Sequence, residues 1–331
     1  MHSPLPRVLV LTLGGTIASV PDAKGHHAVP RLSPAELMAS VPGAAEVADV
    51  RLESFRQYPS GDLSITDMIE LAQLVGRRAD EVDGFVITQG TDTLEETSYA
   101  LDLLLDENGP PVVVTGAMRN AGLPGADGPA NILAAIRVAV SREARGLGPL
   151  VVFADEIHLP RFVRKIHSSS VAAFSSPNAG PVGWVTEERV RIPLLARDRG
   201  PTLQPDAVRV PPPAVGIVKL GLGSGPLLPE HTAGFEGLVV EVFGGGHVPS
   251  SVVQSLAEVN DRIPVVMATR TGAGELYRST YAFPGSEQDL LDRGMISAGA
   301  LDGAKARLLL VLLLASGAGR ADISARFAAA P

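Results

Sequence analysis

Short, continuously apolar segments recur along the chain, and they restrict its fold more than any other feature. Apolar runs without regular polar alternation are typical of strands that are covered on both faces, as in a parallel sheet. The expected strands are Val8–Leu13, Gly84–Thr88, Pro111–Thr115, Leu150–Phe153, Ala214–Leu220, Leu238–Val242 and Pro264–Ala268.

Segments with a helical spacing of apolar residues lie between these runs. They are Ser64–Ala79, Leu94–Leu105, Asn131–Ala144, Val252–Val259 and Ala304–Ala315. Alternating strands and helices predict a doubly wound α/β fold. In such folds ligands bind beyond the carboxyl ends of the strands, so the residues that follow each strand are the candidates for chemistry.

A proline-rich stretch divides this pattern, and 331 residues leave room for two domains. Residues 191–213 contain the run Pro211-Pro212-Pro213, which is stiff and extended and therefore suits a linker. We expect a larger N-terminal domain with a doubly wound, mostly parallel sheet over residues 1–190, and a smaller C-terminal α/β domain over residues 214–331. Residues 156–184 show no clear helical pattern, which predicts irregular or antiparallel structure that closes the first domain.

The composition excludes several classes of function. The chain contains no cysteine, so a thiol nucleophile, disulfides, iron–sulfur clusters and thiolate zinc sites are all ruled out. A net charge of −8 disfavours a nucleic-acid partner. No apolar run reaches the roughly 18 residues of a membrane helix, and the N-terminus lacks the pattern of a signal peptide. We therefore expect a cytoplasmic protein without a membrane partner.

Two further classes lack their signatures. The seven histidines are scattered and form no H-E-x-x-H motif, so no metal site is expected. Gly221-Leu-Gly-Ser-Gly225 is rich in glycine after an expected strand, but the full nucleotide-binding fingerprint is missing. We expect no cofactor.

Hydroxyl groups follow two of the expected strands. The first strand ends in Leu13-Gly14-Gly15-Thr16, where two glycines allow a sharp turn. Thr16 is either a capping residue of that turn or a nucleophile with free backbone amides beside it as oxyanion donors.

The strand Gly84–Thr88 is followed by Gln89-Gly90-Thr91-Asp92-Thr93. Thr93 with Glu96 predicts a capping box for the next helix, but this box leaves Gly90, Thr91 and Asp92 unexplained. A hydroxyl and a carboxylate beside a helix N-terminus could hold a polar ligand.

Two further segments are weaker candidates for the site. Gly116-Ala117, after a third strand, is either an ordinary turn or a place where the backbone can approach a ligand. Lys165 is the only lysine in its arginine-rich segment, and such a lysine is usually a solvated surface charge.

Taken together, these segments closely resemble the bacterial asparaginase family. The specific matches are Leu13-Gly-Gly-Thr-Ile-Ala18, Gly90-Thr-Asp-Thr-Leu-Glu-Glu-Thr97 and Thr115-Gly-Ala-Met-Arg119. Weaker matches are Tyr58-Pro-Ser-Gly-Asp62, Lys165, Thr271-Gly-Ala-Gly274 and Lys305-Ala-Arg-Leu-Leu309. The resemblance spans nearly the whole chain.

The resemblance implies an amidohydrolase that splits L-asparagine into L-aspartate and ammonia through an acyl-enzyme. Thr16 would match the nucleophile, and Thr91, Asp92 and Lys165 would match the group that relays a proton. Ser60 and Asp92 would bind the α-carboxylate and α-amino groups of the substrate, beside Gly61 and Gly90, and Ala117 would contact the amide through its backbone. The resemblance further implies self-association to a homodimer or homotetramer.

The sequence departs from the family at three positions. The loop after Thr16 has no tyrosine to support the nucleophile, and His27 stands roughly in its place, as a substitute or as a solvated loop residue. His247 stands where a neighbouring subunit often offers an asparagine, and is otherwise a polar turn residue. Gly61 replaces a frequent glutamine, so contacts to the amino-acid end of the substrate would be fewer.

Two other functions remain possible, and a third is set aside. A glutaminase-asparaginase of broader specificity would carry the same motifs. A non-catalytic amino-acid-binding α/β protein would share the fold but would not need Lys165 beside Thr91. The related RNA-linked amidotransferase subunit carries an extra N-terminal domain, for which Thr16 lies too near the start.

Overall fold

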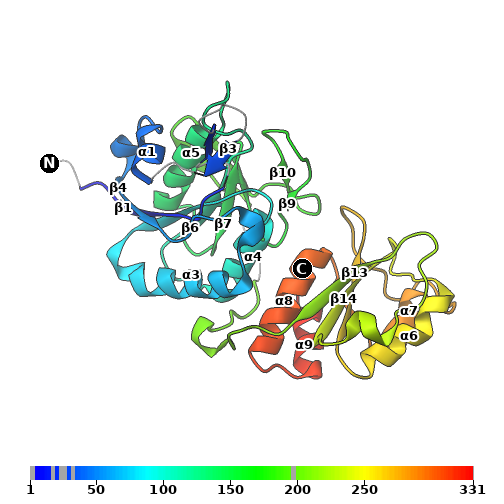
Figure 1. Ribbon diagram of the computed structural model, residues 1–331. Coiled ribbons are helices and arrows are strands. Elements are labelled where there is room, and N and C mark those ends of the chain that lie inside the picture. The colour runs from blue at the N-terminus through cyan, green and yellow to red at the C-terminus, as the bar shows by residue number, and fades with distance from the viewer. Residues whose placement is uncertain (1–3, 16–18, 22–27, 31–33, 195–198, 331) are drawn as a thin grey trace. The chain divides into compact units, whose positions relative to one another are not determined.

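The computed structural model describes residues 4–15, 19–21, 28–30, 34–194 and 199–330. The chain divides into two compact units, Met1–Arg197 and Asp198–Pro331 (Figure 1). We describe each unit by itself. The domain limits that the sequence suggested, with a linker over residues 191–213, stay a prediction.

An eight-stranded mixed sheet forms the centre of the first unit, in the order β12-β11-β8-β7-β6-β5-β1-β4. The pairs from β4 through β1, β5 and β6 to β7 are parallel, and β7, β8, β11 and β12 pair antiparallel. The bounds are β1 Arg7–Thr12, β4 Asp49–Ser54, β5 Gly84–Thr88, β6 Val112–Thr115, β7 Leu150–Phe153, β8 Glu156–His158, β11 Gly183–Thr186 and β12 Arg189–Arg191.

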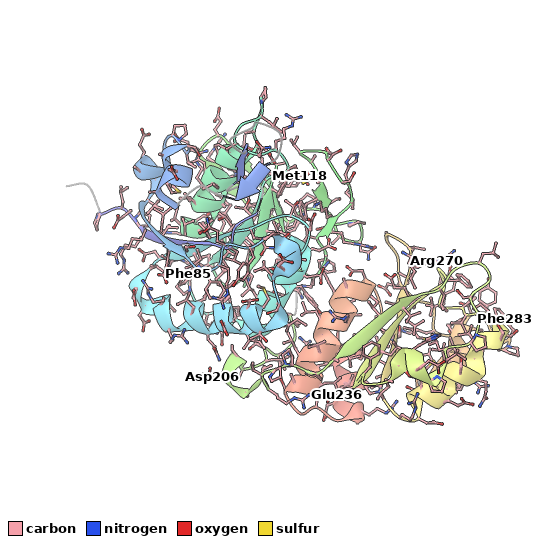
Figure 2. The ribbon with its side chains drawn as sticks, in the orientation of Figure 1. Phe85, Met118, Asp206, Glu236, Arg270 and Phe283 are labelled. Carbon is pink, nitrogen blue, oxygen red and sulfur yellow. The ribbon has the colours of Figure 1, made fainter. Side chains whose placement is uncertain are left out.

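Helices cover both faces of this sheet. Figure 1 shows α5, Gly128–Val140, on one side and α3, Ile65–Arg78, on the other, beside α4, Leu94–Leu104. Alternate residues of the strands face α5, where Val8, Val86 and Val113 pack into one core with Ile132 and Ala135. Phe85, labelled in Figure 2, is fully buried in the centre of the sheet. Strands β5, β6 and β7 are buried along their whole length, as their continuously apolar runs predict.

Shorter elements complete the first unit. They are β2 Ser19–Pro21, β3 Ala28–Pro30, α1 Pro34–Ala39, α2 Ala44–Val47, the 3-10 helices η2 Ser60–Asp62 and η3 Ala79–Glu81, and the hairpin strands β9 Arg164–Lys165 and β10 Phe174–Ser175. Helix α3 begins where its sequence dictates, because Ser64 and Asp67 form a reciprocal capping box.

The second unit has a four-stranded parallel sheet, in the order β13-β14-β15-β16. Helix α8 packs against β13, β14 and β15, and the second core joins β14 and β15 to residues of α6 and α7. The bounds are η4 Pro205–Ala207, β13 Val215–Lys219, η5 Pro229–Thr232, β14 Gly237–Val242, α6 Ser250–Asn260, β15 Val265–Thr269, α7 Glu287–Asp292, β16 Ile296–Ser297, α8 Gly303–Ala315 and α9 Arg320–Ala328.

The predicted fold class is confirmed: the larger first unit carries the mostly parallel sheet and the second a smaller α/β layer structure. Every predicted strand is present, and β5 and β7 have the predicted bounds. Residues 156–184 contain the antiparallel strands that the sequence suggested. Strand β4 and helix α9 were not predicted.

Candidate active site

The carboxyl ends of β1, β5 and β6 meet at one edge of the first sheet. A Cβ atom at Gly15 would overlap the backbone N and Cα atoms of Gly90, and one at Gly14 would lie 2.6 Å from the Tyr58 carbonyl oxygen. Both glycines have a positive φ, +94° for Gly14 and +86° for Gly15. Only glycine fits this conformation and this contact together, so the strand-end turns are packed backbone to backbone.

Lys165 lies in the middle of the predicted catalytic group. Its Nζ donates to Thr91 Oγ1 at 2.8 Å and to Asp92 Oδ1 at 2.7 Å. The Lys165 side chain is 18% exposed and that of Asp92 is 78% exposed, while Thr91 is buried. The structure therefore brings together three residues that the resemblance grouped, and Lys165 is not the solvated surface charge of the alternative interpretation.

Ser60 joins this group from the loop before α3. Its Oγ accepts a hydrogen bond from the Asp92 backbone N–H at 3.2 Å, and its carbonyl accepts from Thr93 Oγ1 at 2.8 Å. The capping box predicted for Thr93 and Glu96 is wrong, since the Thr93 side chain makes no cap hydrogen bond and binds Ser60 instead. Gly61 is exposed, with open space where a side chain would point.

The loop after β6 packs closely against the Thr91 loop. A Cβ atom at Gly116 would lie 2.7 Å from the Gln89 carbonyl oxygen. Asn131 Nδ2 donates to the Gly116 carbonyl at 2.9 Å, and Asp127 accepts from the backbone N–H of Met118 at 3.0 Å. Ala117 is fully buried between them, so its backbone position is well defined.

The group has the parts of a proton relay: a buried hydroxyl, an amine that contacts it, and a carboxylate that orients the amine. Such a group can take up and return a proton at a reacting atom. The predicted nucleophile Thr16 and the loop residue His27 lie outside the described residues. Gly15, directly before Thr16 in the chain, belongs to the contact with Gly90.

His247 belongs to the second unit, after β14. Its Nε2 lies 3.1 Å from Glu287 Oε2, and its ring makes edge contacts to Tyr281 and Phe283, with centroids 5.1 and 5.2 Å away. Burial alone would raise the pKa of Glu287. The hydrogen bonds from the backbone N–H groups of Tyr281 and Thr280 and from the His247 ring together outweigh this effect, so the pKa of Glu287 lies below its usual value.

The glycines before His247 have a local explanation. A Cβ atom at Gly245 would lie 2.8 Å from the Tyr277 ring, and one at Gly246 would lie 2.9 Å from Glu287 Cβ. The glycine run therefore makes room for side chains of the same unit. Phe283, labelled in Figure 2, lies on the surface of this unit and is 46% exposed.

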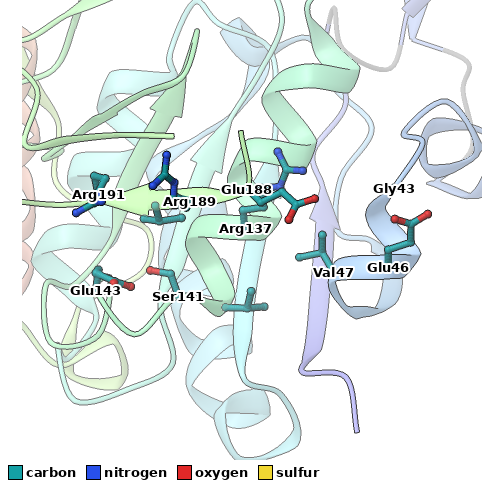
Figure 3. Close-up of a pocket in the computed structure, with 11 residues that line it drawn as sticks. Gly43, Glu46, Val47, Arg137, Ser141, Glu143, Glu188, Arg189 and Arg191 are labelled. Carbon is teal, nitrogen blue, oxygen red and sulfur yellow. The ribbon is translucent and has the colours of Figure 1, made fainter. Parts of the chain in front are cut away.

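A pocket in the first unit, about 660 Å³ in volume, is lined by Arg137, Arg189, Arg191, Glu46, Glu143 and Glu188 among others (Figure 3). It is formed by α2, the end of α5 and β12, and none of the predicted site residues lines it.

No group of three histidine, aspartate or glutamate side chains among the described residues could hold a metal ion. No described helix is both long and apolar enough to cross a membrane.

Sequence reasoning missed one residue of the site. Glu95, in the first turn of α4, accepts a hydrogen bond from the Lys165 backbone N–H. The two residues are 70 positions apart in the chain. A local motif around Thr93 could not disclose a partner on a distant hairpin, although Glu95 stands inside the matched segment Gly90–Thr97.

Comparison with known proteins identifies the family of the chain. The family model described as "Asparaginase, N-terminal" matches residues 7–195, and "Glutaminase/Asparaginase C-terminal domain" matches residues 212–327. The chain is 37% identical over 326 residues to a "Probable L-asparaginase" of Deinococcus radiodurans, covering 98% of this chain and 97% of that protein. It is 36% identical over 321 residues to an "L-asparaginase" of Bacillus licheniformis, covering 94% and 96%.

A solved structure has the same architecture. The "Probable Cytoplasmic L-asparaginase from Campylobacter jejuni" superposes with a TM-score of 0.88 at 30% identity, covering 98% of this chain and 99% of that one. Both halves of the chain match, and the matched segments include the residues around Lys165. The chain therefore belongs to the asparaginase family of amidohydrolases.

Proposed function

We propose that this protein hydrolyses L-asparagine to L-aspartate and ammonia, with Thr16 as the nucleophile. The observation that carries the proposal is the position of Lys165 Nζ between Thr91 Oγ1 and Asp92 Oδ1, at 2.8 and 2.7 Å. A non-catalytic amino-acid-binding protein has no need for an amine held against a buried hydroxyl.

The proposed reaction has two displacements. The Thr16 hydroxyl gives its proton to the pair of Thr91 and Lys165 while its oxygen bonds to the amide carbon. The C–N bond then breaks, the leaving nitrogen takes up the proton, and ammonia departs from an ester of Thr16. Water attacks this ester by the same route, which releases L-aspartate and restores the Thr16 hydroxyl.

Substrate binding is assigned to the residues around this relay. Ser60 and Asp92 would hold the α-carboxylate and α-amino groups, next to the backbone of Gly61 and Gly90. Ser60 is already joined to Asp92 through the hydrogen bond from the Asp92 N–H. The backbone of Ala117 would contact the substrate amide.

Glutamine hydrolysis is the second candidate activity, because one of the matching family models is described as a glutaminase/asparaginase domain. Asparagine and glutamine differ by one methylene, which is worth about 1–3 kcal/mol in a pocket. We further propose a cytoplasmic location and assembly to a homodimer or homotetramer, in line with the family resemblance.

The function is tested by steady-state release of ammonia from L-asparagine, L-glutamine and D-asparagine in parallel, with L-aspartate measured as the second product. The proposal predicts the highest kcat/KM for L-asparagine and equal amounts of ammonia and L-aspartate. Thr16→Ala should abolish the release while the protein stays folded. Binding of L-asparagine without release of ammonia would favour the amino-acid-binding alternative.

A further inference from the structure

The hairpin that carries Lys165 leaves one of its backbone donors without a partner on the opposite strand. Strands β9 and β10 pair Lys165 with Phe174 and Arg164 with Ser175. The Ile166 N–H donates to the Ala173 carbonyl at 2.7 Å. Because hydrogen-bonded and non-hydrogen-bonded pairs alternate in an antiparallel ladder, Lys165 and Phe174 form a non-hydrogen-bonded pair, and the Lys165 N–H points away from β10.

That N–H donates to Glu95 Oε2. Glu95 lies in the first turn of α4, where a carboxylate is stabilised by the positive end of the helix dipole. The bond is charge-assisted, which makes it stronger than a hydrogen bond between neutral backbone groups.

One short segment thus holds Lys165 at two points. Thr91 and Asp92 bind the side-chain amine, and Glu95, one helical turn further on, binds the backbone of the same residue. The far strand of the hairpin is fixed separately, since the rings of Phe174 and Phe153 lie 4.6 Å apart. Glu95 therefore links the Lys165 main chain to the first turn of α4, which directly follows the Thr91 loop.

We propose that Glu95 is a positioning residue for Lys165, whose carboxylate acts as a backbone acceptor and touches neither substrate nor the reacting atoms. This inference rests on the proposed function. Its physical basis is that a proton relay works only within hydrogen-bond distance, and that a displacement of about 1 Å can cost roughly 100-fold in rate.

Two substitutions distinguish the loss of the hydrogen-bond acceptor at Glu95 from the loss of its negative charge. Glu95→Gln keeps a carbonyl oxygen that can accept from the Lys165 N–H, whereas Glu95→Ala removes the acceptor. Both remove the same negative charge from the first turn of α4, so the difference between the two variants reports on the Glu95 side-chain carbonyl as an acceptor and not on its charge.

Kinetics with L-asparagine give the first measurement. We expect kcat to fall by about 10- to 100-fold in Glu95→Ala and by no more than about threefold in Glu95→Gln. KM should change little in both, because Ser60 and Asp92 are untouched. Wild-type kcat in Glu95→Ala, or equal losses in the two variants, would overturn the proposal.

Hydrogen exchange at the Lys165 amide gives a second measurement that does not depend on activity. We expect faster exchange at this amide in Glu95→Ala and near-wild-type exchange in Glu95→Gln, with exchange in the central strands β5 and β6 unchanged as the control for folding. Unchanged exchange at Lys165 in Glu95→Ala would overturn the inference. Absence of asparagine hydrolysis in the wild type would overturn the proposed function alone.

Discussion

At the scale of single residues, the hairpin that carries Lys165 is tied to the core through a buried histidine. His158, on β8, is fully buried, and its Nδ1 lies 3.0 Å from Ser176 Oγ, directly after β10. Its Nε2 lies 3.2 Å from Glu156 Oε2. Burial lowers the pKa of His158 to about 4 despite this carboxylate, because the charged imidazolium would lose its water.

Because His158 is buried in its neutral form, we expect the folded protein to lose stability in acid. Since the folded pKa lies below the unfolded value of about 6.5, the unfolded chain binds a proton that the folded protein excludes as the pH falls from about 6.5 to 4. The free energy of unfolding should therefore drop by about 3 kcal/mol over this window through His158 alone, and the contribution is fully present above pH 6.5.

The measurement is urea unfolding across this pH range, followed by fluorescence of the single tryptophan. Trp184 pairs with Glu156 on β8, so it reports on the region around His158. His158→Gln should flatten the pH dependence, and the exposed control His231→Gln, in the second unit, should not. The same slope in His158→Gln and wild type would contradict the assignment.

At the scale of elements, direct backbone contacts join the turns that follow β1 and β5. Gly15 and Gly90 touch through their main chains, and Gly14 approaches the main chain of Tyr58. The turns after β1 and β5 therefore hold each other at a fixed distance, which sets the position of Thr91.

Gly15→Ala should accordingly destroy activity and lower stability by more than the cost of its backbone conformation. Gly43 is the matched control, because its φ is +81° but nothing lies within 4 Å of an added Cβ. We expect Gly43→Ala to cost about 1–2 kcal/mol and to keep its activity, and Gly15→Ala to cost about 1–3 kcal/mol more. Urea unfolding and asparagine turnover are measured for both variants. Equal losses of stability in Gly15→Ala and Gly43→Ala would show that the contact between Gly15 and Gly90 does not contribute to stability.

The elements also show why the sequence predicted some parts and not others. Strands β5 and β7 are covered on both faces, so their apolar runs mark both ends. Strand β4 lies at the edge of the sheet, and the polar residues Asp49, Arg51 and Glu53 alternate with its apolar ones, so it contains no continuous apolar run. The capping box at Thr93 failed because a distant partner, Ser60, competes for the hydroxyl.

At the scale of the whole molecule, the pairings of Lys165 with Thr91 and Asp92 join positions more than 70 residues apart. No local pattern contains such a contact. The resemblance to a family supplied it, whereas Glu95 and His158 had no assigned role and became visible only in the folded chain.

His247 gives a prediction about assembly. We expect a homodimer or homotetramer in solution in which His247 reaches the site of a neighbouring subunit, so His247→Ala should raise KM for asparagine more than it disturbs folding. If some His247 variant is inactive, it can be mixed with inactive Thr16→Ala subunits under conditions of subunit exchange. Shared sites predict partial recovery of activity, and no recovery despite proven exchange would mean that each site is self-contained.

The central claim is that Lys165, held by Thr91 and Asp92, relays the proton in amide hydrolysis, and kcat of Lys165→Met with L-asparagine tests it most directly. Methionine has a similar length but cannot carry a proton. The exposed Asp92 stays hydrated without its partner, so the thermal midpoint should remain close to that of the wild type. The account predicts that kcat falls by about 10²- to 10⁴-fold. A folded Lys165→Met protein with wild-type turnover would contradict it.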